Sequence, residues 1–256
     1  MRISDFTWLA IRGPVLSLVL VLPANAAQWP LKISQNGRFL TDQANVPFLV
    51  HGDSPWVMPA ALTTNEMVTY FDDRERRGFT AVLVQLETDA WVPDDPANRY
   101  GDVPFSSPGD FSTANDDYFA VVDFMLNYAK SKGIVVFAVP LYFGFSDSEG
   151  WADEMRAQTD ANVRAYGEFL GDRYRNQGNI IWTMGGDRIP NTTESSRLNA
   201  LRDGIASRDP NHLFSAHGLL SEGAVTYNHP WLDVNSSYTY STALYADVLT
   251  AYESLK

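Results

Sequence analysis

The chain has 256 residues and carries 31 acidic against 19 basic side chains, which gives a formal net charge of −12. This charge argues against a nucleic-acid-binding protein, because neutralising phosphates requires clustered lysine and arginine, and the 45% hydrophobic content with 13% aromatic residues excludes a disordered chain. The chain has no cysteine, so disulfides, thiolate metal sites and a cysteine nucleophile are all excluded.

The first 26 residues have the pattern of a secretory signal peptide. Arg2 and Arg12 precede a short apolar run at residues 14–22, and Ala24-Asn25-Ala26 follows as an A-x-A cleavage signal. The run is shorter than the roughly 20 apolar residues that a membrane span requires, and no later stretch is long enough either. A buried N-terminal strand or helix is the alternative interpretation. We predict cleavage after Ala26 and a secreted or periplasmic protein without a membrane span.

From residue 27 onward, short apolar runs alternate with longer amphipathic stretches. Thr63 and Glu66 form a capping box that begins a helix ending at Gly78, and Thr113 can cap a second helix that stops at Gly133. Further helices are expected at residues 159–175, 193–207 and 243–254. Six strands are expected at residues 47–50, 81–86, 134–141, 180–184, 213–216 and 231–234.

This alternation predicts a single α/β domain over residues 27–256 with a parallel sheet. A doubly wound sheet and a (β/α)8 TIM barrel both satisfy the pattern, but no G-x-G-x-x-G or P-loop motif follows the first strand. Polar residues follow nearly every strand, which is where a barrel builds its active site. We therefore favour the barrel, with residues 91–111 as a long loop over the site. Six units are found where a closed barrel has eight, so the sequence looks like a barrel truncated after its sixth βα unit.

The side chains expected at the carboxyl ends of the strands are of the kinds that bind sugars. Carboxylates, amides and imidazoles hydrogen-bond to sugar hydroxyls, and aromatic rings pack against the C–H faces of a sugar ring. No basic cluster that would hold a phosphate occurs there. Trp91, Trp151 and Trp231 are individually uninformative, because each is more often a core residue. The substrate-binding candidates, in chain order, are His51, Asp53, Trp56, Gln85, Tyr142, His217 and Tyr238.

Asp187 is the main catalytic candidate. It follows the apolar run at residues 180–184 through Gly185 and Gly186, which let the backbone turn closely around a ligand. A carboxyl beside Trp182, partly removed from water, would have a raised pKa and could act as a general acid. The alternative interpretation is that Gly-Gly-Asp is only a turn with an Asx cap.

His51 and Asp53 also permit a metal site, since His-x-Asp at a strand end can present two ligands to one ion and His217 could be a third. With only four histidines in the chain, the interpretation as sugar-binding groups is favoured, and no metal or cofactor is expected. A purely structural hydrogen bond at the strand end is a further alternative. A Ser-His-Asp triad is not indicated, because the chain lacks a G-x-S-x-G elbow.

Sequence motifs occur along the chain in this order: WPLKIS (29–34), NGRFL (36–40), FLVHGD (48–53) with Trp56, RGFT (77–80), NRYGDVPF (98–105), NDDYF (115–119), NIIW (179–182) with GGD (185–187), and WLDVN (231–235). Together they resemble the apiosidase-like glycoside hydrolases, that is, glycoside hydrolase family 140 and related barrel domains. The resemblance implies a (β/α)8 barrel and a retaining mechanism with Asp187 at the acid/base position. It also implies that the nucleophile is a Glu after a seventh strand, beyond Lys256, and it gives Glu87 no catalytic role.

We therefore expect a secreted retaining glycoside hydrolase that cleaves plant cell-wall polysaccharide of the pectic kind. Its partner would be a carbohydrate, and no nucleic acid is expected. Two other classes remain open. One is a non-catalytic carbohydrate-binding barrel that keeps the pocket but lacks the nucleophile. The other is a metal-dependent barrel hydrolase that uses His51, Asp53 and His217.

Overall fold

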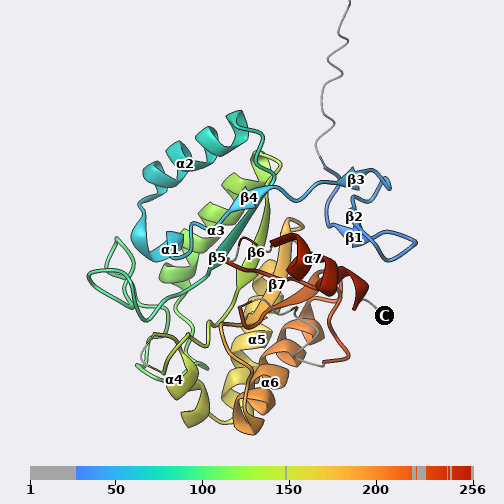
Figure 1. The fold of residues 1–256 in the computed structure, drawn as a ribbon. Coiled ribbons are helices and arrows are strands. Elements are labelled where there is room, and N and C mark those ends of the chain that lie inside the picture. Colours follow the sequence, from blue (N-terminus) through green and yellow to red (C-terminus); the bar gives the residue numbers. More distant parts are fainter. Residues whose placement is uncertain are drawn as a thin grey trace, which may run out of the picture.

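The computed structural model describes residues 27–147, 149–220, 223, 229–240, 242 and 244–254. The predicted signal peptide, residues 1–26, lies outside the described residues. A three-stranded antiparallel sheet comes first, and a five-stranded parallel sheet with connecting helices follows (Figure 1). In this part of the chain no helix is both long enough and apolar enough to cross a membrane.

The antiparallel sheet corrects one prediction. Its strands are, in order, β1 (Lys32–Ile33), β2 (Leu40–Thr41) and β3 (Pro47–Phe48). Residues 47–50 were expected to be the first strand of the parallel sheet, and this is wrong, because β3 pairs with β2 in antiparallel register. The first parallel strand is instead the two-residue β4 (Gly52–Asp53). A short apolar run can join either kind of sheet, since its periodicity does not report its partner.

The parallel sheet has the strand order β4-β5-β6-β7-β8. After β4, its strands are β5 (Ala81–Gln85), β6 (Val135–Val139), β7 (Ile180–Gly185) and β8 (Leu213–His217). These four strands were predicted within a few residues. The expected sixth strand, residues 231–234, contributes only an isolated parallel bridge between Ser215 and Val234. The α/β class with a parallel sheet is therefore confirmed, while closure of an eight-stranded barrel stays a prediction.

Four of the helices that the structure describes begin at a residue whose side chain caps them. The helices are α1 (Met58–Ala61), α2 (Thr64–Arg76), α3 (Asp116–Ser131), α4 (Ala152–Ala157), α5 (Asp160–Tyr174), α6 (Thr192–Arg208) and α7 (Leu244–Glu253). The predicted capping box between Thr63 and Glu66 is present at the start of α2. Asn115 rather than Thr113 caps α3, and a second capping box begins α6.

Side chains on both faces of the parallel sheet are buried, which explains its continuous apolar runs. Val82 and Trp182 belong to the larger core, which the sheet forms with α2, α3, α5 and α6 and which we call the helix-side core. The residues that precede them, Ala81 and Ile181, point the other way and pack with Leu40 of the antiparallel sheet. Successive residues of a strand therefore alternate between two different cores.

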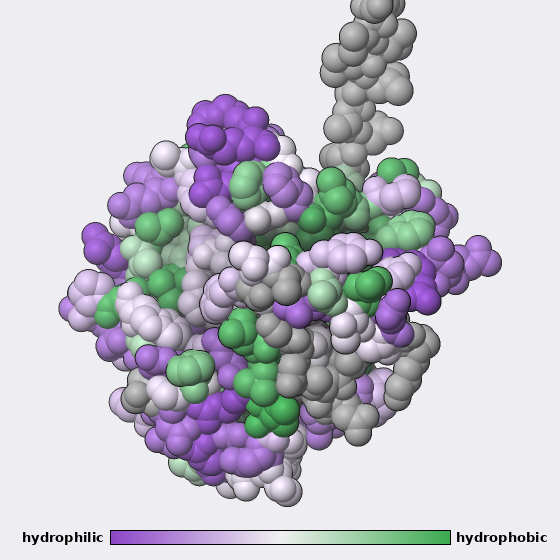
Figure 2. Space-filling view, in the orientation of Figure 1, coloured by the Kyte–Doolittle hydropathy of each residue, from purple (hydrophilic) through white to green (hydrophobic). Residues whose placement is uncertain are grey.

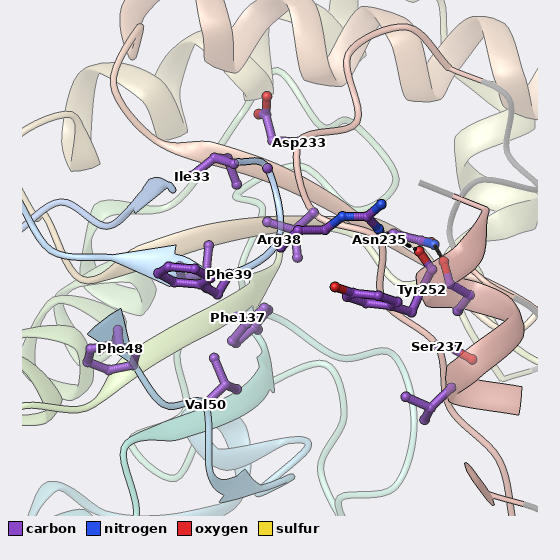
Figure 3. Close-up of a pocket in the computed structure, with 16 residues that line it drawn as sticks. Ile33, Arg38, Phe39, Phe48, Val50, Phe137, Asp233, Asn235, Ser237 and Tyr252 are labelled. Atoms are coloured by element: carbon purple, nitrogen blue, oxygen red, sulfur yellow. Dashed lines mark hydrogen bonds between the residues drawn. The ribbon is translucent and has the colours of Figure 1, made fainter. Parts of the chain in front are cut away.

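The antiparallel sheet is also tied to α7, which lies on the same side of the molecule (Figure 1). Arg38 Nη1 donates to the carbonyl oxygen of Tyr252 at 3.1 Å, and the guanidinium carbon lies 4.6 Å from the centre of the Tyr252 ring. An apolar groove of about 590 Å³ lies between the two elements, with Phe39 and Phe137 in its lining (Figure 3). Hydrophobic side chains also reach the surface over the segment between β3 and β4 (Figure 2), where Leu49 is 76% exposed.

Candidate active site

Asp187 lies just beyond the carboxyl end of β7, where the chain turns through Gly185 and Gly186. Gly186 has a φ of 154°, and a Cβ atom built there would lie 2.3 Å from Cδ2 of Tyr142. Only glycine therefore lets the backbone pass so close to the Tyr142 ring. The turn brings the Asp187 carboxylate to the hydroxyl of that same tyrosine.

Three side chains converge on the Asp187 carboxylate. Tyr142 Oη donates to Oδ2 at 2.5 Å, and Tyr238 Oη donates to Oδ1. His217 Nε2 lies 2.9 Å from Oδ1 and donates to it in the tautomer with a proton on Nε2. Burial and the bond to Asp187 raise the pKa of Tyr142, so its hydroxyl stays protonated and available as a donor.

These contacts decide the charge of Asp187. Burial alone would raise the pKa of Asp187, but the hydrogen bonds from His217, Tyr142 and Tyr238 outweigh it and lower that pKa to about 2. The prediction of a raised pKa is therefore wrong for this structure. It assumed that Trp182 would lie against the carboxyl, whereas Trp182 faces the helix-side core.

A cavity of about 460 Å³ opens beside this carboxylate. Aromatic rings form part of its wall: Trp56, His217 and Tyr238 line it, and the rings of His217 and Tyr238 stack with their centres 4.6 Å apart. The Trp56 indole also meets the ring of Tyr142 edge-on, with the ring centres 5.1 Å apart. Tyr240 also lines the cavity and is 86% exposed. A cavity that combines a carboxylate, hydroxyls, an imidazole and aromatic faces has the groups that a sugar ring requires.

Gln85 is buried beneath this cavity and does not line it. With its amide oriented to satisfy both neighbours, Gln85 accepts a hydrogen bond from Trp56 Nε1 and donates to the carbonyl oxygen of Glu87 at 3.1 Å. Gln85 thus orients the Trp56 indole, and the geometry does not support its predicted contact with substrate.

Glu87 is also enclosed by protein. Its Oε2 accepts from Tyr166 Oη at 3.1 Å, and burial raises its pKa well above the usual range. It is 1% exposed and lies outside the cavity lining. The structure therefore gives Glu87 no access to a substrate.

His51 lies far from Asp187, at the amino end of the parallel sheet. Its Nδ1 atom is 3.3 Å from the carbonyl oxygen of Gly78, and its ring lies 4.6 Å from that of Phe79. Both of these residues precede β5, whereas Asp187 follows the carboxyl end of β7. The predicted substrate contact through His51 is therefore not supported by its position.

Asp53 points toward the helices and away from the cavity. It accepts hydrogen bonds from Tyr70 Oη and, at 2.7 Å, from Arg74 Nε, both on α2. Asp53 pairs in register with Val82, whose side chain belongs to the helix-side core. Because paired residues of parallel strands point to the same face, the register places Asp53 on that face too. Its role in this structure is a structural ion pair.

The expected metal ligands are not brought together. His51 lies at the amino end of the sheet, Asp53 is paired with Arg74, and His217 contacts Asp187. Across the described ranges, no group of three or more histidine, aspartate or glutamate side chains could hold a metal ion. The structure therefore does not support a metal-dependent hydrolase that uses these three residues as ligands.

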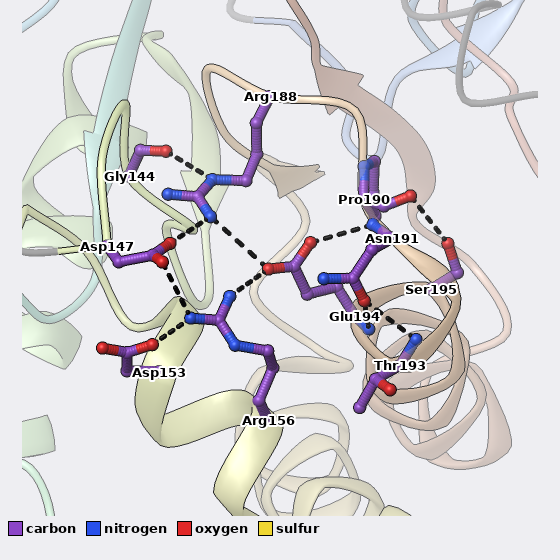
Figure 4. A network of polar contacts seen from close by, with 10 residues as sticks. All are labelled: Gly144, Asp147, Asp153, Arg156, Arg188, Pro190, Asn191, Thr193, Glu194 and Ser195. Carbon is purple, nitrogen blue, oxygen red and sulfur yellow. Dashed lines mark hydrogen bonds and ion pairs between the residues drawn. The ribbon is translucent and has the colours of Figure 1, made fainter.

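An ion-pair network fixes the segment that follows the candidate carboxylate (Figure 4). Arg188 Nη1 lies 2.6 Å from Asp147 Oδ1 and 3.4 Å from Glu194 Oε1. Glu194 is buried at the start of α6 and also accepts from Arg156. Asp147 belongs to the loop after β6 that supplies Tyr142. The network thus joins the loops after β6 and β7, whose side chains meet at the site.

Trp91, one of the three tryptophans that are individually uninformative in the sequence, lies beside this site. It is 47% exposed, and its ring centre lies 5.6 Å from that of Tyr142. The only signal available in the sequence was its position in the long loop at residues 91–111. A single tryptophan in a loop has no periodicity from which its exposure could be inferred.

The apolar groove of Figure 3 is larger than the cavity beside Asp187 but lacks its chemistry. Its charged lining residues are Arg38, which lies over the Tyr252 ring, and Asp233, which accepts from the Phe214 amide at 2.9 Å. The candidate active site is therefore the smaller cavity.

The comparisons with known proteins concern the family and the fold of the chain. A family model described as "Apiosidase-like, catalytic domain" matches residues 34–254. The chain belongs to the apiosidase-like family. The resemblance inferred from the sequence motifs is thus confirmed. No curated protein sequence matches the chain.

Solved structures show the same relationship at the level of fold. One described as "Glycoside hydrolase" is 29% identical with a TM-score of 0.67, over 81% of this chain and 45% of that one. A glycoside hydrolase family 5 structure from Bacteroides vulgatus ATCC 8482 is 28% identical with a TM-score of 0.67, over 80% and 43%. An endo-1,4-beta-mannanase from Rhizomucor miehei, 14% identical with a TM-score of 0.54 over 73% and 60%, is similar in fold alone. The apiosidase-like chain spans less than half the length of the first two structures.

Proposed function

We propose that this apiosidase-like chain is the catalytic part of a glycoside hydrolase in which Asp187 is the acid/base residue. The observation that carries the proposal is the setting of this carboxylate. It stands at the carboxyl end of β7, beside a cavity with aromatic walls, and three side-chain donors converge on it. Membership of the family and similarity to glycoside hydrolases support the same reaction class.

The proposed chemistry requires Asp187 to change its protonation state. As an acid it must carry a proton when the glycosidic oxygen departs, yet a pKa of about 2 keeps it ionised in the free protein. Bound substrate would raise this pKa by removing water from the cavity, and a second carboxylate nearby would raise it further. In a retaining enzyme that carboxylate is the nucleophile, about 5–5.5 Å from the acid/base. The ionised form, which the three donors stabilise, is the state that would activate water in the second step.

We further propose a retaining mechanism, export directed by residues 1–26, and pectic plant cell-wall polysaccharide as substrate. The retaining mechanism and the pectic substrate rest on the family resemblance, and export rests on the basic, apolar and A-x-A pattern of the first 26 residues. Trp56, Tyr142, His217 and Tyr238 are the proposed substrate contacts, because they line the cavity or bind the Asp187 carboxylate.

A non-catalytic carbohydrate-binding role is the second candidate. One observation favours it: the three donors stabilise an ionised Asp187, which would serve as a hydrogen-bond acceptor for sugar hydroxyls without any proton transfer. The two candidates predict different effects when this carboxylate is replaced.

The test compares wild type with Asp187→Asn on pectic polysaccharide and on aryl glycosides, each in a protein that includes the nucleophile predicted after the seventh strand. Asparagine keeps the shape but cannot donate a proton to the leaving oxygen, so turnover of polysaccharide should fall by about 10²–10⁴-fold. Aryl glycosides with good leaving groups need less protonation, so their loss should be smaller. Azide should restore part of the rate, because it attacks a glycosyl-enzyme without help from a base.

Asp203→Asn, at an exposed aspartate of α6, is the matched control and should keep the wild-type rates. Near-normal turnover by Asp187→Asn would make Asp187 a turn residue and contradict the proposal. A wild-type protein that binds oligosaccharides but cleaves none of these glycosides would favour the binding role.

A further inference from the structure

Trp91 is an exposed tryptophan held in an unfavourable backbone conformation beside the candidate site. Its φ is 71°, in the left-handed region that bulky residues rarely adopt, and the residue is 47% exposed. Its ring lies 5.6 Å from that of Tyr142, whose hydroxyl donates to Asp187. A large ring kept at the surface at a conformational cost indicates a role other than packing.

Trp91 extends the aromatic wall of the site beyond the cavity. The Tyr142 ring contacts Trp56 at 5.1 Å and Trp91 at 5.6 Å, and Trp56 lines the cavity whereas Trp91 does not. An oligosaccharide that reaches Asp187 through the cavity and continues past Tyr142 would therefore meet the indole of Trp91.

The loops around Trp91 are strongly acidic. Residues 86–115, 140–159 and 186–191, which follow β5, β6 and β7, contain eleven aspartates and glutamates against three arginines. Ten acidic side chains remain when Glu87 is left out, because burial raises its pKa. Arg156 and Arg188 are already paired with carboxylates of their own network. A ligand carboxylate placed here would be repelled by an excess of like charge, whereas an uncharged sugar would not.

One carboxyl of these loops has a raised pKa, mainly because it is half-buried. Burial, together with the charges of Glu154 and Asp95, raises the pKa of Asp89 to about 6. Asp89 is two residues from Trp91 in the chain, and the charges of Glu154 and Asp95 act on it.

We infer that Trp91 is a stacking platform for a neutral sugar ring of the substrate, and that the acidic loops around it exclude uronate residues from that position. This inference rests on the proposed function and specifies the chemical class of the sugar at one subsite. Aromatic rings stack on the apolar C–H face that sugars present. Within pectic material, neutral side-chain sugars and esterified uronates fit this position, and free galacturonate does not.

The test uses one mixture of oligosaccharides released from pectin by mild acid, divided into two halves. In one half the uronate carboxyls are converted to methyl esters, so the two probes share sugars and linkages and differ in charge. Binding to the full chain is measured by native mass spectrometry at low and high salt. Trp91→Asn removes the ring and suits a left-handed backbone, Trp91→Tyr keeps a ring, and Tyr245→Ala removes an exposed ring from α7 as the control.

Wild type should bind the esterified oligosaccharides more tightly than the free uronate oligosaccharides. High salt should reduce this difference in binding, because it screens the repulsion between the acidic loops and the uronate carboxylates. Trp91→Asn should lower binding of the esterified probe about three- to tenfold, while Trp91→Tyr and Tyr245→Ala should keep most of it. Equal binding by wild type and Trp91→Asn overturns the platform and leaves the role of Asp187 intact. Tighter binding of free uronates overturns the charge selection. Failure of wild type to bind any oligosaccharide overturns the proposed function as well.

Discussion

Two aspartates near strand ends show how the partner of a carboxylate limits what it can do. Asp53 is held by the Arg74 guanidinium, which can only donate hydrogen bonds and therefore stabilises only the ionised form. Asp187 is held by His217 and by the hydroxyls of Tyr142 and Tyr238, and a hydroxyl can donate or accept. If Asp187 gains a proton, a tyrosine hydroxyl can rotate so that its oxygen accepts a hydrogen bond from the protonated carboxyl. The site of Asp187 thus tolerates both protonation states, as an acid/base residue requires.

Tyr142→Phe should raise the pKa of Asp187, because it removes a donor to the ionised carboxylate. The change should be visible as a shift of the Asp187 carboxyl titration, followed by ¹³C NMR from neutral pH down to about pH 2. Because folding lowers the pKa of Asp187, the hydrogen bond from Tyr142 stabilises the folded protein at pH values above the unfolded pKa of 3.8. This stabilisation is lost as the pH falls through about 2. The variant should therefore be less stable than wild type at neutral pH and close to it in strong acid.

Tyr70→Phe is the matched control, since it removes the corresponding hydroxyl from Asp53 on the helix side. It should leave the Asp187 titration unchanged. An Asp187 titration that is the same in wild type and Tyr142→Phe would show that the other two donors suffice.

The sequence could predict the turn that carries Asp187 but could not place every residue around it. Gly-Gly-Asp after an apolar strand is a local signal, and the turn forms where it was predicted. The direction of Asp53 depends on its register against Val82, which is set by long-range pairing between strands. The pKa of Asp187 depends on Tyr238, which lies 51 residues away in the chain. Neither dependence is visible in a short window of sequence.

At the scale of elements, α5 and α6 pack so closely that their contact requires glycine. A Cβ atom at Gly167 would lie 2.3 Å from the carbonyl oxygen of Leu201, and one at Gly204 would lie 2.3 Å from that of Arg164. Contacts this short involve backbone atoms, so relief would require one helix to move. This packing holds α6 and its N-terminal Glu194 against the loops that carry the site.

Gly167→Ala should therefore destabilise the protein by about 1–3 kcal/mol, although alanine in an exposed helix position would stabilise it by up to about 1 kcal/mol. Urea denaturation of wild type and variant gives the difference. Ala165→Gly, at an exposed position of the same helix, is the control and measures the propensity effect alone, about 1 kcal/mol. A higher urea midpoint for Gly167→Ala would show that the helices can separate without loss.

The strands that are buried on both faces were easiest to predict, because each of them is a continuous run of apolar residues. β5, β6 and β7 are of this kind, and each was found within a few residues. The segment from Pro47 to Asp53 was harder, because it divides between two sheets with different partners. Its apolar residues satisfy either sheet, so only the three-dimensional pairing distinguishes them.

The whole molecule combines a net charge of −12 with exposed apolar side chains around the groove of Figure 3. Phe39 is 46% exposed and Val50 is 45% exposed, and both line this groove. Apolar surface of this kind promotes association, while like charge opposes it. The balance between the two should depend on ionic strength.

We expect the protein to bind a hydrophobic dye and to associate more strongly as salt is raised, because salt screens the repulsion between acidic surfaces. Phe39→Ser should weaken dye binding and light scattering, whereas Leu220→Ser, which alters an exposed leucine outside the groove, should change them little. Dye binding that is unaffected by Phe39→Ser would exclude the groove as the adhesive surface.

The contact between Arg38 and Tyr252 joins residues 214 positions apart. At a synthesis rate of 5–20 residues per second, a ribosome would need about 10–40 s to make the second partner after the first. During that interval α7 is not yet made and cannot cover the edge of the antiparallel sheet that it packs against. Early folding on the ribosome would leave the sheet exposed, so the N-terminal region is the part of the nascent chain with the longest need for a holding chaperone.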